Sequence, residues 1–80
     1  MEFVKRFESK DRVDVSGEFY TMLEVVVNYY TQYNDLKADV AIYDLDINER
    51  IEFENLSNED RFSVNKILEE FHYEFKRSLC

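Results

Sequence analysis

The sequence predicts an α+β fold: a small antiparallel β-meander of three or four strands with one long C-terminal helix packed on one face. Three observations predict it. Apolar residues recur at helical spacing after residue 57, two segments between residues 39 and 55 alternate apolar with other side chains, and residues 25–31 are β-branched and aromatic. No proline and a single glycine interrupt the 80 residues, so we expect one domain, residues 1–80.

The N-terminal residues give the weakest signals. Phe3–Glu8 and Arg12–Val15 are short segments with some alternation, and either could supply an additional edge strand. A helical turn at Phe3–Phe7 is the alternative for the first of them.

Residues 17–34 fit both a helix and a strand. A helix would gather a polar stripe through Glu24 and Asn28, whereas a strand would alternate apolar with mixed side chains. The β-branched and aromatic composition favours the strand. Adjacent residues of a strand face opposite sides, so Tyr29 and Tyr30 cannot both enter the core. Residues 33–37 are then expected to form the loop into the next strand.

Residues 39–47 and 50–55 read as two strands joined by a turn. Opposed residues of an antiparallel pair share a face. A two-residue loop at residues 48–49 would oppose Asp46 to Ile51, whereas a three-residue loop at residues 48–50 keeps apolar residues opposite apolar ones. The pattern predicts the pairs Ile47–Ile51, Leu45–Phe53, Asp46–Glu52 and Asp44–Glu54.

The C-terminal helix carries the clearest signals. Ser57 can cap it, Asp60 completes a capping-box pattern, and Lys76 and Arg77 occupy the last turn, where cations are favoured. About 20 residues would make it about 30 Å long. Its predicted apolar stripe consists of Val64, Ile67, Leu68, Phe71, Phe75 and Leu79.

The net charge of the chain limits the classes of molecule that it could bind. Eighteen acidic and ten basic residues give a net charge of −8, which disfavours direct binding to nucleic acid or to anionic membranes. The longest apolar run is Val25–Val27, and no apolar run follows the first basic residues, so we expect neither a membrane span nor a signal peptide, and a cytoplasmic location. The same charge is also what keeps a small aromatic-rich domain soluble.

Few residues in this sequence could bind a metal or a cofactor or act in catalysis. One cysteine, Cys80, and one histidine, His72, cannot build a disulfide framework or a zinc cluster, so Cys80 is expected to be an exposed terminal thiol and His72 a boundary packing residue. The sequence contains no phosphate-binding glycine loop and no metalloprotease or hydrolase motif. We expect no cofactor, no metal and no enzymatic activity.

The candidate functional residues are acidic and lie in the two central strands. The predicted register gathers four carboxylates on the sheet face away from the helix, where like charges opposed across strands are destabilising. A basic protein surface would relieve that repulsion, and tyrosine is common at interfaces; a solvated outer face that prevents edge pairing is the alternative. The candidate partner-binding residues are Asp44, Asp46, Glu52, Glu54 and Tyr30.

These observations suggest a small acidic non-enzymatic binding protein. It would inhibit or modulate a larger protein with a basic surface, such as a nucleic-acid-binding protein. The residue usage, rich in Asn, Asp, Lys, Ile and Tyr and free of proline, is typical of accessory genes of phages and mobile elements, which would place it in the host cytoplasm. The alternative is a structural or assembly module that self-associates as a homodimer.

Overall fold

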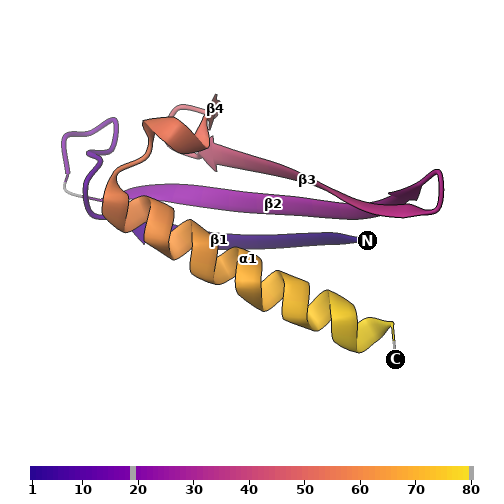
Figure 1. The fold of residues 1–80 in the computed structure, drawn as a ribbon. Helices are drawn as coiled ribbons and strands as arrows, with labels where there is room; N and C mark the ends of the chain where they lie inside the picture. Colours follow the sequence, from indigo (N-terminus) through magenta and orange to yellow (C-terminus); the bar gives the residue numbers. More distant parts are fainter. Residues whose placement is uncertain (19, 80) are drawn as a thin grey trace.

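The computed structural model describes residues 1–18 and 20–79 and confirms the α+β meander (Figure 1). One antiparallel sheet has the strand order β1-β2-β3-β4, and a single long helix packs on one of its faces. The prediction for the Cys80 thiol lies outside the described residues. The elements are β1 (Glu2–Ser9), β2 (Thr21–Gln32), β3 (Asp35–Asp44), β4 (Glu49–Ile51), the 3-10 helix η1 (Phe53–Asn55) and α1 (Asn58–Ser78).

The first strand lies at one edge of the sheet. β1 pairs with β2 over its whole length, from Glu2 opposite Asn28 to Ser9 opposite Thr21, so the edge strand predicted at residues 3–8 is confirmed. The second segment considered as a strand, residues 12–15, belongs instead to the connection between β1 and β2.

The strand interpretation, made for residues 17–34, is confirmed for Thr21–Gln32, which form β2. Leu23, Val25, Val27 and Tyr29 alternate into the core, while Tyr30 faces the other side of the sheet. The β-branched composition decided between the two structures because those side chains pack well on a pleated surface and lose rotamer freedom in a helix.

A two-residue turn joins β2 to β3, so the predicted loop over residues 33–37 is wrong. Tyr33 and Asn34 have positive φ angles of 54° and 67°, as a type I′ turn requires, and Gln32 pairs directly with Asp35. The turn matches the twist of the two strands, and pairing therefore resumes at once instead of after five residues.

Rebuilding this turn as Asn-Gly is expected to stabilise the chain. A non-glycine residue in the left-handed region costs roughly 1–2 kcal/mol, less for Asn, and the Tyr33 side chain is 90 % exposed, so its removal loses little packing. The double variant Tyr33→Asn, Asn34→Gly should raise the free energy of unfolding by about 1 kcal/mol in urea titrations. The control Asn34→Val should lower the free energy of unfolding, because a β-branched residue is strained at a positive φ. If the Asn-Gly variant were less stable than the Val variant, the proposed turn geometry would be wrong.

The pairing of β3 with β4 differs from the predicted register. Ile42, not Ile47, lies opposite Ile51, and Asp44 lies opposite Glu49. The chain leaves β3 after Asp44 and makes a four-residue turn over residues 45–48, so the predicted three-residue loop at residues 48–50 is wrong. The Asp44 carboxylate favours the early turn by accepting a hydrogen bond from the backbone N–H of Asp46 (3.0 Å).

The segment after β4 is not the strand predicted over residues 50–55. β4 ends at Ile51, and residues 53–55 form η1. The predicted pairs of Phe53 with Leu45, Glu52 with Asp46 and Glu54 with Asp44 are therefore absent from the described sheet.

The helix begins as predicted. Ser57 is the N-cap, and its hydroxyl accepts a hydrogen bond from the Asp60 N–H (3.2 Å). Phe75 stacks on Tyr29 with ring centroids 4.4 Å apart, and Phe71 stacks on Phe3 at 5.3 Å. The apolar stripe is confirmed for Val64, Ile67, Leu68, Phe71 and Phe75, whereas Leu79, which follows the last turn, is exposed.

The helix covers only part of the sheet. Figure 1 shows α1 running beside β1 and β2, with β3 on the far side and the tip of the β2–β3 hairpin reaching beyond the covered part. The radius of gyration is 14.0 Å, against about 12 Å for a compact chain of this length. A single helix is too narrow to cover four strands, so part of the helix-side face of β3 stays open.

Candidate functional site

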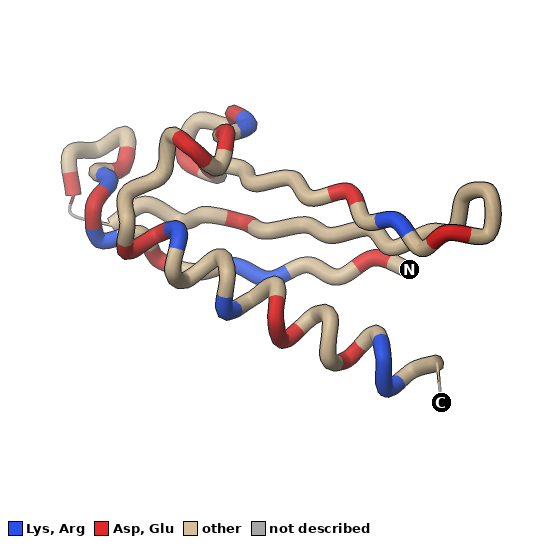
Figure 2. The backbone as a smooth tube through the Cα atoms, viewed as in Figure 1, with Lys and Arg blue, Asp and Glu red and all other residues tan. Residues whose placement is uncertain are grey.

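The four candidate acids do not share one sheet face. Asp44 points to the helix side and is only 4 % exposed, Asp46 lies in the turn after β3, Glu52 lies between β4 and η1, and Glu54 lies on η1. The predicted gathering of four carboxylates on the face away from the helix is wrong. Figure 2 shows acidic residues distributed over loops, strands and helix.

Asp44 is a structural residue. Its carboxylate accepts hydrogen bonds from both Nε and Nη2 of Arg12 (3.3 and 3.1 Å) and from the buried Thr21 hydroxyl (3.2 Å). These contacts tie the connection between β1 and β2 to the end of β3. The Thr21 hydroxyl also lies within hydrogen-bond distance of the Asp46 carboxylate, so the two carboxylates share its one proton. The Asp44 carboxylate is thus buried and paired with a cation of its own chain, whereas Asp46 is only partly buried.

A second buried acid was not anticipated. Asp60 is buried at the start of α1 and accepts a hydrogen bond from the buried Ser9 hydroxyl at the end of β1 (2.5 Å). The sequence assigned Asp60 only to helix capping. Its contact with a residue 51 positions away leaves no local signal, because no periodicity connects the two segments.

The connection that carries Arg12 is held by its own carboxylate. Asp14 accepts hydrogen bonds from the backbone N–H groups of Glu18 (2.7 Å) and Ser16 (3.0 Å) and from the Ser16 hydroxyl (2.8 Å). These bonds, the one from Glu18 foremost, lower the pKa of Asp14 below its usual value, against a smaller opposing effect of desolvation. Gly17, with a φ of 91°, allows the tight turn.

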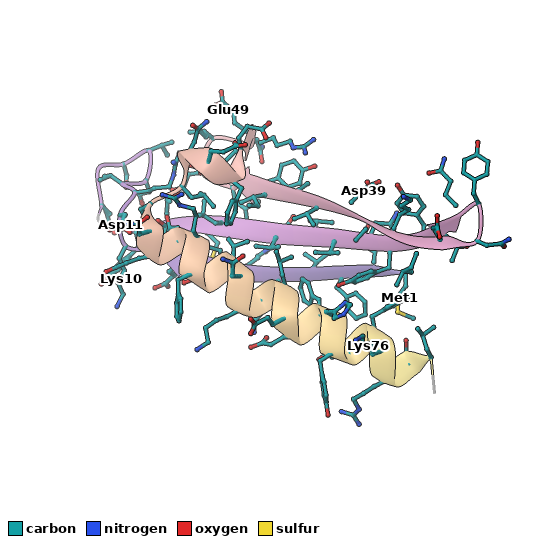
Figure 3. All side chains as sticks on the ribbon, viewed as in Figure 1. Met1, Lys10, Asp11, Asp39, Glu49 and Lys76 are labelled. Atoms are coloured by element: carbon teal, nitrogen blue, oxygen red, sulfur yellow. The ribbon has the colours of Figure 1, made fainter. Side chains whose placement is uncertain are left out.

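The two adjacent tyrosines have different roles. Tyr29 is buried among the helix aromatics, and burial raises the pKa of its hydroxyl. Tyr30 lies on the open face, away from the helix, and its hydroxyl donates to the Asp39 carboxylate (3.4 Å). Figure 3 labels Asp39 on β3, on the side away from α1. Tyr30 is thus the one candidate found on the predicted face.

A concave surface lies on the helix side, between β3 and α1. We call it the β3–α1 groove; it has a volume of about 590 Å³ and adjoins a second hollow of about 280 Å³ through Val40, Asn65 and Leu68. Leu36 and Val40 are 49 % and 38 % exposed there. The β3–α1 groove is lined by Val27, Tyr29, Leu36, Lys37, Ala38, Val40, Asn65, Leu68, Glu69 and His72.

Sequence reasoning missed this groove for two reasons. The expected loop over residues 33–37 includes Leu36, and the expected register puts Asp44, and with it by alternation Val40 and Ile42, on the face away from the helix. In the structure β3 carries Val40 and Ile42 on the helix side. His72 is exposed on α1 at the groove wall, and its ring lies 6.4 Å from that of the buried Tyr29, at the edge of the apolar stripe as expected.

The outer edge of β3 is free over most of its length. β4 pairs only with residues 42–44, and within the part of the chain that the structure describes no strand pairs with residues 35–41 on the side away from β2. Unpaired backbone groups along such an edge are a template for another strand. The free edge and the β3–α1 groove lie side by side.

Comparison with models of protein families, with curated proteins and with solved structures finds no match to this chain. Among residues 1–18 and 20–79, no group of three or more His, Cys, Asp or Glu side chains is placed to hold a metal ion. The one long helix of the described residues is not apolar enough to cross a membrane.

Proposed function

We propose that this chain is a non-enzymatic protein-binding module that docks a larger partner protein in the β3–α1 groove. The observation that carries the proposal is the open apolar strip of β3, with Leu36 and Val40 exposed beside a groove large enough to accept side chains. Exposed apolar surface of this kind, bordered by polar residues, marks interaction sites in small soluble domains.

The partner that we propose has a basic surface around an apolar contact. Glu69 lines the groove, Glu52 lines the adjoining hollow, and Glu54 follows on η1, all exposed, in a chain of net charge −8. The effect on the partner would be inhibition or modulation, a nucleic-acid-binding protein being one such target. We propose the cytoplasm as the setting, that of the host if the gene belongs to a phage.

A matched pair of double variants tests the groove. Leu36→Gln with Val40→Thr makes it polar, and Leu79→Gln with Val15→Thr makes the same two changes at exposed positions elsewhere. Proteins retained from a bacterial lysate by the immobilised parent are identified, purified and titrated against each variant. The groove variant should bind at least about tenfold more weakly and the control should bind as the parent does. A purified partner that binds the groove variant as tightly as the parent contradicts the proposal.

Charge is tested separately. Glu52→Lys with Glu54→Lys should weaken binding to a basic partner, and the affinity of the parent should fall as salt rises. Asp44 is unsuitable for this test, because its replacement removes the bonds to Arg12 and Thr21. If neither salt nor the charge reversal changes the affinity, the partner does not bind through a basic surface. Docking in the β3–α1 groove would not be contradicted by that result.

A further inference from the structure

The free edge of β3 has a directional pattern of backbone groups. The N–H and C=O of Tyr29 both bond to Met1, across to the β1 side. Since backbone groups alternate along a strand, those of Asn28 and Tyr30 point to β3, where they meet Asp39 and Lys37. The backbone groups of Lys37 and Asp39 thus point toward β2. The N–H and C=O groups of Leu36, Ala38 and Val40, which alternate with them, therefore point outward from the edge.

The side chains along this edge are complementary to themselves in the reverse direction. Around Ala38 the order is Leu36-Lys37-Ala38-Asp39-Val40. If two copies align antiparallel with Ala38 opposite Ala38, Lys37 of each copy lies opposite Asp39 of the other, and Leu36 lies opposite Val40. Cross-strand pairs of opposite charge and of apolar side chains each stabilise a sheet, and every pair here is of one of these kinds or is alanine with alanine.

We propose that a second copy of this chain pairs with β3 along this edge, about a two-fold axis at Ala38. The outward groups of Leu36, Ala38 and Val40 would form about six backbone hydrogen bonds between the copies. The sheets would join into one, with both helices on the same side and the two β3–α1 grooves meeting along the join. This inference goes beyond the proposed binding of a larger partner: it concerns the backbone edge of β3, which shares Leu36 and Val40 with the groove.

Other alignments of the same edge are less favourable. An axis at Lys37 or at Asp39 places that residue opposite its own copy, so like charges face each other. An axis at Leu36 keeps an opposite-charge pair between Asp35 and Lys37 but joins only residues 35–37, because the turn follows. The axis at Ala38 uses residues 35–41, the whole free length, and stops one residue before Ile42, where β4 begins to pair.

The ends of the pairing are also complementary in charge. In the proposed alignment Asp35 of one copy lies opposite Ala41 of the other. Arg50 lines a hollow together with Ala41 and Asp39. The Asp35 carboxylate of the second copy would therefore lie close to the Arg50 guanidinium. Each copy carries a net charge of −8, but charges more than about 10 Å apart are largely screened at 0.1 M salt, so the pairs at the edge decide the association.

The other free edge is less suited to a second copy. On β1 the two basic side chains already have partners within the chain: Lys5 pairs with Glu70 (2.8 Å) and Arg6 with Glu24 (2.9 Å). The helix also covers this side of the sheet. Self-pairing of β1 would therefore compete with existing ion pairs, whereas Lys37 and Asp39 are exposed and Asp39 accepts only a long hydrogen bond from the Tyr30 hydroxyl (3.4 Å).

Charge exchange provides the test. Light scattering of the purified parent should give about twice the monomer mass of 9.8 kDa at high concentration. Lys37→Asp and Asp39→Lys should each raise the dimer dissociation constant at least about tenfold, because each sets like charges opposite one another at two symmetric places. The double exchange Lys37→Asp, Asp39→Lys restores both pairs and should return the parent's mass. Lys10→Asp, at an exposed loop position, is the matched control.

Hydrogen exchange on the unmodified chain gives a second test that needs no variant. The amides of Lys37 and Asp39 bond to β2 and should exchange slowly at every concentration. Those of Leu36, Ala38 and Val40 should exchange slowly only in the dimer and quickly on dilution. Protection that alternates in this way supports the edge pairing.

Several outcomes would overturn this inference. A monomeric parent at all accessible concentrations excludes the dimer. A dimer unaffected by either single exchange, or lacking the alternating protection, uses another surface. A double exchange that stays monomeric while circular dichroism shows a folded chain removes the pairing of Lys37 with Asp39. Leu36, Lys37 and Val40 belong to the groove as well as to the edge, so the two proposals are separated by Asp39→Lys, which changes no residue that lines the groove. This variant should weaken the dimer and leave partner binding in the groove in place.

Discussion

Phe71→Ala is expected to lower the free energy of unfolding by about 3–5 kcal/mol, the usual loss for deleting a buried phenylalanine ring. Phe71 is buried on α1 and stacks on Phe3, so it connects the helix to the edge strand as well as to the core. A domain of 80 residues typically has a total stability of about 4–12 kcal/mol. The variant should therefore unfold at a much lower urea concentration than the parent, as followed by circular dichroism.

The same helix supplies a matched control. Phe62 is 64 % exposed and contacts the Lys66 ammonium, 5.5 Å from its ring centre. Phe62→Ala removes the same atoms without opening a cavity and should cost less than about 1 kcal/mol. Equal losses for the two variants would mean that the helix does not pack as described here.

Asp44→Ala is expected to have the second largest effect, a loss of about 2–3 kcal/mol. Removing the carboxylate leaves the buried Thr21 hydroxyl with fewer partners and strands the Arg12 guanidinium, whose side chain is only 33 % exposed. Loss of one partner of a buried pair can cost about 3–5 kcal/mol, and the exposure of Arg12 to water reduces that figure.

Two variants isolate the origin of this loss. Asp35→Ala makes the same change at an exposed position of the same strand and should alter stability by less than about 0.5 kcal/mol. Arg12→Ala should cost less than Asp44→Ala, because Thr21 and the Asp46 N–H would keep their acceptor. In urea titrations the double variant of Arg12 and Asp44 should lose less than the sum of the single losses. If the two losses are additive, the ion pair between Arg12 and Asp44 does not contribute to stability.

The sequence predicted the elements that depend on local chemistry. The Ser57 cap, the helical repeat of apolar residues and the β-branched composition of β2 all act within a few residues, and each was confirmed. The alternation of β2 also predicted correctly that Tyr29 and Tyr30 separate to opposite faces.

The register of β3 could not be predicted in the same way. The prediction set the apolar pairs Ile47–Ile51 and Leu45–Phe53 toward the helix, which put Asp44 on the opposite face by alternation. Its partners, Arg12 and Thr21, come from another part of the chain, 32 and 23 positions away, and no local pattern announces them. Once Asp44 is placed inside, Ile42 and Val40 follow it to the helix side by alternation, and the groove appears.

The candidate site moved for this reason. The predicted acidic face requires two strands that pair over residues 44–54. In the structure the four-residue turn precedes a second strand of only three residues, Glu49–Ile51, so this pairing does not form. The shortened strand exposes the outer edge of β3, whose pattern of Leu36, Lys37, Asp39 and Val40 was present in the sequence but was assigned to a loop and to the start of a strand.

The two-residue turn at Tyr33 and Asn34 also sets the order in which the chain assembles. Pairs between β2 and β3 start only three positions apart, at Gln32 and Asp35, so they close the smallest loops and lose the least chain entropy. The contact of Ser9 with Asp60 spans 51 positions and is the costliest to form in that sense. We therefore expect the β2–β3 hairpin to form early and the Ser9–Asp60 hydrogen bond to form late. Ser9→Ala should then raise the unfolding rate more than it lowers the folding rate, as measured by stopped-flow kinetics in urea.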